Sequence, residues 1–201
     1  MTFVAALRAR IGEWLANSVG EVHQLRGFRV VVEKSRADIA TADVLERLDE
    51  ALALLEEVEP GRMRHLRRDL EYFWIARYPC RGAYFPDTRS CLTELTFLAR
   101  RDISAAVVAS SILHEGVHAR VARFRARVGG SSGEENRARE ERLCRRMELS
   151  FGRKLPAELG APVIERALAS LAMEDAEVSP AIDWSVARAR IAAVDANADQ
   201  G

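Results

Sequence analysis

The longest helix that the sequence predicts contains the stretch Ser110-Ser111-Ile112-Leu113-His114-Glu115-Gly116-Val117-His118-Ala119-Arg120. This helix is expected to run from Ile103 to about Val128, because Asp102 can cap its N-terminus and Gly129-Gly130 ends it. His114 and His118 lie four residues apart and therefore one above the other, so both imidazoles can reach a single metal ion. Three apolar residues share their face, which predicts that the pair points into the protein: Ile103, Val107 and Val121.

Glu115 follows the first histidine and is turned from it by about 100° around the helix. This position sets a carboxylate beside a metal ion without making it a ligand. Zinc lowers the pKa of a bound water and polarises a carbonyl, and a neighbouring carboxylate can take the water's proton and pass it to a leaving amine. The pattern therefore predicts a Zn²⁺ site with His114 and His118 as ligands and Glu115 as the catalytic base for peptide-bond hydrolysis.

A second helix is predicted to begin within Ser131-Ser132-Gly133-Glu134-Glu135, which offers two overlapping capping boxes, and to run to about Leu155. Its periodicity predicts a buried stripe formed by Leu143, Cys144, Met147 and Phe151. Glu140 falls near the centre of that stripe, whereas Glu141 and Glu148 share one edge. Helical phase alone leaves open which glutamate faces the histidines, and each of the three is equally suited to a solvated pair with a neighbouring arginine. Cys144 is interpreted as a buried packing residue.

The stretch from Ser110 to Arg120 resembles the active-site helix of the zincin metallopeptidases, whose motif is HExxH. The glutamate-rich helix that follows is similar to the gluzincin branch, in which a glutamate on that helix is the third ligand. A metzincin would need a further histidine where Phe124 stands. The resemblance covers roughly residues 66–155 and is greatest to small bacterial zincin-like proteins. It implies Glu141 as the third ligand, with Glu140 as the alternative, and Glu148 as a hydrogen-bond acceptor for a ligand histidine.

The same resemblance implies a substrate cleft beside the helix. In zincins the strand before the active-site helix runs along the cleft, and its free edge pairs with an extended substrate. That strand would be residues 82–92, where Pro86 agrees with a sheet edge, although a plain surface hairpin fits the residues equally well. Tyr84 or Arg120 is the expected donor to the oxyanion.

The rest of the chain predicts a mostly helical α+β fold with a small sheet in a single zincin-like domain, residues 1–201. Its expected parts are an N-terminal helical region with a short strand (1–60), the metal-site core (66–155) and C-terminal helices (156–201). Hydrophobic spacing and turn residues predict the following elements: helices over 4–15, 44–58, 162–173 and 182–194, strands over 28–32 and in the second half of 66–75, and a frayed tail over 195–201.

Composition narrows the functional classes. Nearly half of the 201 residues are hydrophobic, and 30 Lys and Arg balance 30 Asp and Glu, so the chain is globular and has no basic field for nucleic acid. The longest uncharged run, Ile103–Leu113, is too short to span a membrane. Three cysteines and an N-terminus without a secretion signal favour the cytoplasm, with one bridge between Cys80 and Cys91 left open. His23 and His65 receive no role.

Three functional hypotheses follow. The first is a zinc-dependent metallopeptidase that acts on a peptide or protein substrate. The second is a catalytically inactive zincin-like module that binds a protein. The third is a helical interaction protein without a metal.

Overall fold

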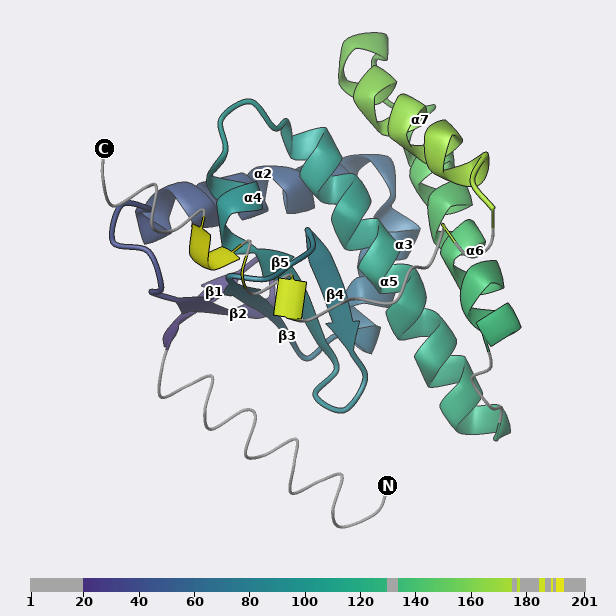
Figure 1. The fold of residues 1–201 in the computed structure, drawn as a ribbon, viewed down its shortest axis with the longest axis horizontal. Coiled ribbons are helices and arrows are strands. Elements are labelled where there is room, and N and C mark those ends of the chain that lie inside the picture. Colours follow the sequence, from purple (N-terminus) through teal and green to yellow (C-terminus); the bar gives the residue numbers. More distant parts are fainter. Residues whose placement is uncertain are drawn as a thin grey trace.

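The structure is a computed structural model that describes residues 20–129, 134–174, 177, 185–186, 189 and 191–193. Within these residues the fold is α+β, as the sequence predicts, with a five-stranded mixed sheet and long helices (Figure 1). Its elements are β1 (Gly20–Leu25), β2 (Phe28–Glu33), α2 (Thr41–Val58), α3 (Pro60–Asp69), β3 (Tyr72–Ala76), β4 (Gly82–Phe85), β5 (Ser90–Glu94), α4 (Leu95–Ala99), α5 (Ala105–Val128), α6 (Glu134–Gly152) and α7 (Ala157–Leu171).

The sheet has the strand order β1-β2-β3-β5-β4. The inner strands β2, β3 and β5 are parallel to one another, whereas β1 and β4 are antiparallel to their neighbours and form the two edges. The run Phe28–Glu33 is rich in valine, which suits a strand that is buried between neighbours. Because β4 is an edge strand, one of its sides is unpaired among the described strands.

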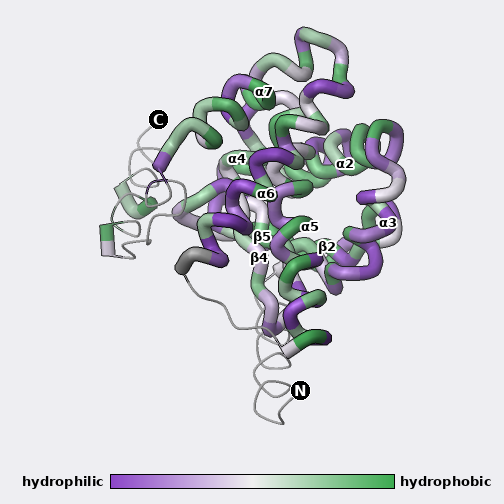
Figure 2. Tube along the Cα trace, turned by 90° about the vertical axis from the view of Figure 1, so that its right-hand side faces the viewer, coloured by the Kyte–Doolittle hydropathy of each residue, from purple (hydrophilic) through white to green (hydrophobic). Residues whose placement is uncertain are grey.

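Helices cover one face of the sheet. Alternate side chains of the inner strands, such as Val30, Phe73 and Cys91, join the main hydrophobic core together with residues of α2, α3 and α5. A smaller cluster of Val31, Tyr72 and Trp74 lies on the opposite face. Figure 2 shows that hydrophilic residues dominate α3 and α6, so these helices contribute only narrow apolar faces to the core.

The helix α5 has the predicted extent but a different N-cap. Ser104, not Asp102, caps it, because its side chain accepts a hydrogen bond from the Val107 backbone N–H. Asp102 instead binds Arg100. Gly129 ends the helix at φ 69°, a left-handed conformation that glycine adopts without strain. The result is a 24-residue helix that carries both histidines between the sheet and α6.

Close packing of α6 against α7 depends on two glycines. A Cβ atom added to Gly160 would lie only 2.3 Å from the Gly152 carbonyl oxygen, so the two backbones touch at this point. The helix α7 begins at Ala157, five residues before the predicted start, and it contains Pro162 in its interior. The predicted start at residue 162 was wrong, because Pro156 occupies the N-cap and the helix continues through Pro162.

Replacing Gly160 with Ala is expected to lower the free energy of unfolding by about 1–3 kcal/mol, the usual cost of overpacking a tight contact. The new methyl would meet a backbone oxygen, which can move only if the helices separate. Urea unfolding measures the change. Gly61→Ala is the control, since its Cβ would meet only the flexible end of Arg64 at 3.7 Å. Equal stability of the two variants would contradict the close crossing.

Other predicted elements agree with the structure or lie outside its described part. The predicted strand at 28–32, the helix at 44–58 and the strand in the second half of 66–75 are confirmed as β2, α2 and β3. The strand β1 was missed. The predicted helix at 4–15, the capping residues Ser131 and Ser132 and the tail at 195–201 lie outside the described residues, as does most of 182–194.

No helix within the described residues is both long enough and apolar enough to cross a membrane.

Candidate metal centre

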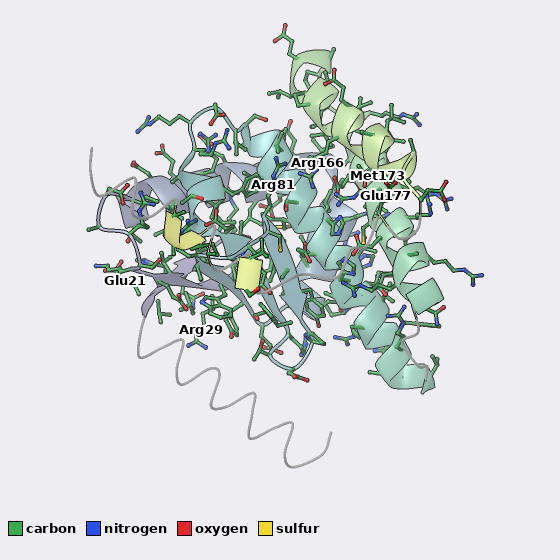
Figure 3. The ribbon with its side chains drawn as sticks, in the orientation of Figure 1. Glu21, Arg29, Arg81, Arg166, Met173 and Glu177 are labelled. Atoms are coloured by element: carbon green, nitrogen blue, oxygen red, sulfur yellow. The ribbon has the colours of Figure 1, made fainter. Side chains whose placement is uncertain are left out.

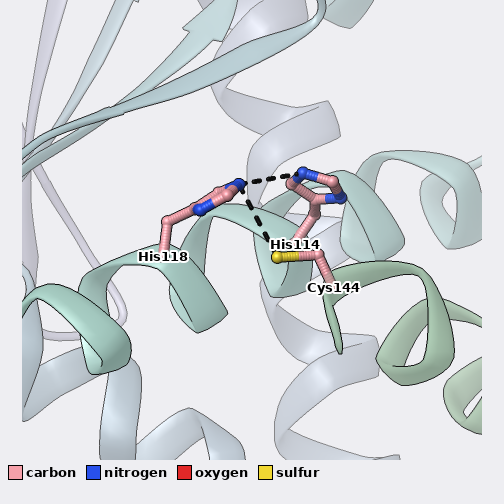
Figure 4. Close-up of side chains that lie close together, drawn as sticks. All are labelled: His114, His118 and Cys144. Carbon is pink, nitrogen blue, oxygen red and sulfur yellow. Dashed lines mark hydrogen bonds between the residues drawn. The ribbon is translucent and has the colours of Figure 1, made fainter. Parts of the chain in front are cut away.

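Two imidazoles on α5 point toward a common position. The His114 and His118 side chains are only 9% and 19% exposed, and their Nε2 atoms lie 3.1 Å apart (Figure 4). Two ligands at 2.0–2.1 Å from a tetrahedral zinc ion are separated by roughly 3.3 Å. The Nε2 atoms therefore have about the spacing of two zinc ligands.

Glu141 of α6 faces the gap between the two rings. Its Oε2 atom lies 3.2 Å from His114 Nε2, and its Oε1 atom lies 3.3 Å from His118 Nε2. These separations also agree with shared ligation of one zinc ion. The residues that the zincin resemblance implies as ligands thus lie together in the folded chain.

Each histidine has a second glutamate on its other ring nitrogen. His114 Nδ1 lies 2.6 Å from Glu148 Oε1, and His118 Nδ1 lies 2.7 Å from Glu140 Oε1. Such carboxylates hold the imidazole ring in position and keep its proton on Nδ1, which leaves Nε2 free to bind a metal. The zincin resemblance implies this role for Glu148. Glu140, the alternative third ligand, lies on Nδ1 of His118 instead, a contact that the sequence did not predict.

Arginines fix both of these carboxylates. Arg125 Nη1 lies 2.5 Å from Glu140, and Arg145 Nη1 lies 2.7 Å from Glu148. Glu148 is fully buried, and its Oε2 atom lies 3.6 Å from Nη2 of Arg166 on α7. Figure 3 shows the position of Arg166, and Arg81 is near enough for its charge to act on it. Three helices therefore contribute to two chains of contacts that run from arginine through glutamate to histidine.

The electrostatics of the cluster favour the charged forms of both the imidazoles and the Glu141 carboxylate. Burial would lower the pKa of His114 and His118, but hydrogen bonds to the surrounding side chains outweigh it and raise both pKa values. Burial would likewise raise the pKa of Glu141, yet the two imidazoles hold it below its ordinary value. The metal-free site therefore retains protons on its imidazoles at pH values where an ordinary histidine is neutral.

Zinc binding is expected to release protons and to weaken as the pH falls. Protons and zinc compete for the same Nε2 atoms, and the raised histidine pKa values extend this competition to neutral pH. Calorimetry between about pH 6 and about pH 8, in buffers of different ionisation enthalpy, measures both effects. Glu140→Gln should reduce the proton release, because it removes a carboxylate that raises the His118 pKa. An affinity that does not change with pH would contradict the prediction.

Glu115 lies on the sheet side of the histidine pair. Its side chain is buried against β4, so a Cβ atom on Gly82 would approach Glu115 Oε1 to 3.1 Å. Burial raises the pKa of its carboxyl, and the described part of the chain supplies it with no hydrogen-bond donor. Gly116 beside it allows α5 to approach Leu66 of α3, where a Cβ would clash at 2.5 Å. Both glycines thus permit close packing around Glu115.

All three cysteines are free, so the bridge between Cys80 and Cys91 is absent. Cys91 packs in the hydrophobic core, while Cys80 is exposed and donates to the Gly82 carbonyl.

Cys144 is fully buried on α6, and its Sγ atom lies 3.6 Å from His118 Nε2 (Figure 4). Leu143, which was predicted to be buried beside it, is 44% exposed. The buried stripe of α6 therefore contains Cys144 and Phe151, as predicted, with Glu148 in place of Leu143, because the stripe follows the crossing with α5.

The predicted strand at 82–92 is a hairpin of β4 and β5, with Pro86 in the turn between them. Its outer strand β4 contacts α5. Of the two expected oxyanion donors, Tyr84 packs against the core near Arg89, Asp69 and Arg123, and Arg120 is exposed near His65. A second phenol feels the charge of the base, because burial and then the charges of Cys80 and Glu115 raise the pKa of Tyr78.

A cavity of about 330 Å³ opens beside the segment between β3 and β4. Tyr78 and Cys80 line it, and the charge of Glu115 acts on both side chains. Sequence reasoning missed this cavity, since its walls come from residues 77–81, 94–103 and 191, which are far apart in the sequence.

Comparison of the chain with models of known families, with curated proteins and with solved structures found no match.

Proposed function

We propose that the protein is a zinc-dependent metallopeptidase of zincin-like architecture. The observation that supports this proposal is the convergence of His114 Nε2, His118 Nε2 and the Glu141 carboxylate, all separated by 3.1–3.3 Å. Two nitrogen ligands and one carboxylate are a ligand set of catalytic zinc sites. The donors fit the ion in type, spacing and burial.

Glu140 and Glu148 support this assignment from the far side of the rings. Both accept the Nδ1 proton of a histidine and both are fixed by arginine, so the rings are oriented before a metal binds. Histidines buried only for packing need no carboxylate on each ring nitrogen. The paired contacts favour a metal site over a structural hydrogen-bond network.

Glu115 is the proposed general base. A bound zinc ion would lower the pKa of water and polarise the scissile carbonyl. Glu115 takes the proton from the attacking water and returns it to the leaving nitrogen. Its burial raises its pKa, which brings it closer to the neutral range where a general base is most effective. The nearby Tyr78 phenol is suited to donate to the developing oxyanion.

The edge strand β4 is the proposed binding surface for the substrate backbone. An extended peptide can add to a free sheet edge through backbone hydrogen bonds. Gly82 of β4 lies against Glu115, so a peptide on this edge would carry a scissile bond past the base. The adjoining cavity of about 330 Å³ can receive a substrate side chain.

The test combines metal analysis with an unbiased substrate search. Protein purified without chelator should contain about one zinc per chain. Mass spectrometry of a peptide mixture should show cleavage that chelator abolishes and added zinc restores. Protein without zinc, or zinc-loaded protein that cleaves no peptide and no protein in the mixture, would contradict the proposal.

A second candidate function is a zincin-like module that binds a protein without cleaving it. The position of Cys144 favours this alternative, because a thiolate at the metal would occupy the place that catalysis needs. The two functions differ in their response to Glu115→Gln. A peptidase loses turnover and keeps zinc, whereas a binding module keeps both zinc and its ligand.

A further inference from the structure

Cys144 occupies a position beside the proposed metal that packing alone does not explain. It follows Glu141 by three residues on α6, so the two side chains are neighbours on the same helix face. Its Sγ atom lies 3.6 Å from His118 Nε2, and the donor atoms of His114, His118 and Cys144 all lie within 4.8 Å of one another. Figure 4 shows the sulfur directed toward the two rings.

The sulfur distance agrees with ligation. A thiolate binds zinc at about 2.3 Å and an imidazole at 2.0–2.1 Å, so a tetrahedral ion separates sulfur and nitrogen by roughly 3.6 Å. With Glu141, the two helices then supply four donors: an i, i+4 pair from α5 and an i, i+3 pair from α6. Four protein ligands complete the tetrahedron.

Comparison with Cys91 separates ligation from packing. Both cysteines are fully buried, but Cys91 belongs to the hydrophobic core and Cys144 does not. The Cys144 sulfur contacts the imidazole of His118, whereas the Cys91 sulfur contacts the backbone oxygen of Leu92. A cysteine that serves as an apolar filler is expected in surroundings like those of Cys91.

We propose that Cys144 is the fourth ligand of the metal centre in its resting state, so that the centre is closed by a thiolate until that thiolate is displaced. This inference rests on the proposed metal site and adds its regulation. Closed four-coordinate zinc sites are inert, whereas catalytic sites keep one open position. Hydrolysis therefore requires Cys144 to leave, and substrate docking on β4 and α5 is the event that can displace it.

The test uses the full chain loaded with Co²⁺ as the probe. Tetrahedral cobalt gives visible d–d bands, and a bound thiolate adds a sulfur-to-cobalt charge-transfer band in the near ultraviolet. The wild type should show both. Cys144→Ser should keep the d–d bands and lose the charge-transfer band, with a fall in metal affinity of roughly tenfold or more. Cys80→Ser is the matched control and should retain both bands.

X-ray absorption of the zinc-loaded wild type gives a second measurement that needs no variant. One sulfur neighbour at about 2.3 Å is expected. Visible d–d bands without a charge-transfer band, or a zinc shell without sulfur, would overturn the thiolate proposal and leave the metal site intact. Failure to bind cobalt or zinc would overturn the proposed function together with this inference. Peptide hydrolysis that is faster in Cys144→Ser than in the wild type is the expected kinetic result, and slower hydrolysis would contradict the closed resting state.

Discussion

Replacing Glu141, the proposed third ligand, with Gln is expected to reduce zinc affinity by roughly 100-fold or more, because loss of a ligand exceeds the 10- to 100-fold effect typical of an outer partner. The Glu141 carboxylate lies 3.2 Å from Nε2 of His114 and 3.3 Å from Nε2 of His118. Glu140 and Glu148 contact the Nδ1 atoms instead. Glutamine keeps the shape of the side chain but offers a neutral oxygen. Competition with a fluorescent zinc chelator measures the affinity.

The neighbouring glutamates supply graded controls for this experiment. Glu140→Gln and Glu148→Gln should each weaken zinc binding by about 10- to 100-fold, since each glutamate orients one histidine. Glu158→Gln, at an exposed position on α7, should have no effect. Circular dichroism must show that the variants fold, because Glu148 is buried between two arginines. A larger loss in Glu140→Gln than in Glu141→Gln would make Glu140 the third ligand.

Replacing Glu115 with Gln is expected to lower the hydrolysis rate by roughly 10²- to 10⁴-fold, the usual contribution of general acid–base catalysis. The amide has nearly the same volume, so it fits the same space against Gly82. It cannot accept the proton of the attacking water. The measurement is kcat on the peptide that the wild type cleaves fastest in the mixture, together with the zinc content of the protein.

Zinc content distinguishes the outcomes of this second experiment. The Glu115→Gln variant should keep about one zinc per chain, because Glu115 is not among the groups nearest the Nε2 atoms. Glu158→Gln should retain full activity and full zinc. Unchanged hydrolysis in Glu115→Gln would remove Glu115 from the mechanism, whereas lost zinc would make it a ligand.

Strong local patterns predicted the elements that hold the site. The helix α5, the strand β2 and the helix α2 follow from hydrophobic spacing and from end signals, because burial of one face determines their periodicity. The strand β1 was missed since its residues Gly20–Leu25 alternate weakly and remain partly exposed at an edge. Its turn to β2 uses Arg26 and Gly27 at positive φ, a pair that lacks the common Asn-Gly or Asp-Gly signal.

The glutamate positions show where sequence reasoning reached its limit. Adjacent residues on a helix are turned by about 100°, and both Glu140 and Glu141 can face a partner helix. The crossing of α5 and α6 decides between them: Glu141 meets the Nε2 atoms and Glu140 meets Nδ1 of His118. The same crossing buries Cys144 and exposes Leu143. The arginines that hold Glu140 and Glu148 come from α5, α6 and α7, so no single segment predicted them.

The amino-acid sequence alone determined the helix that carries His114, Glu115 and His118, because an i, i+4 spacing within one helix is a local property. Only the tertiary structure decided which side chains complete the cluster. Glu141 and Cys144 lie at the Nε2 atoms of the histidines, and Glu140 and Glu148 lie at the Nδ1 atoms. The strand β4 lies against Glu115. The physical reason is that contacts between helices depend on the angle at which they cross and on how closely they pack. Packing of the whole fold sets both quantities, so no short stretch of sequence determines them.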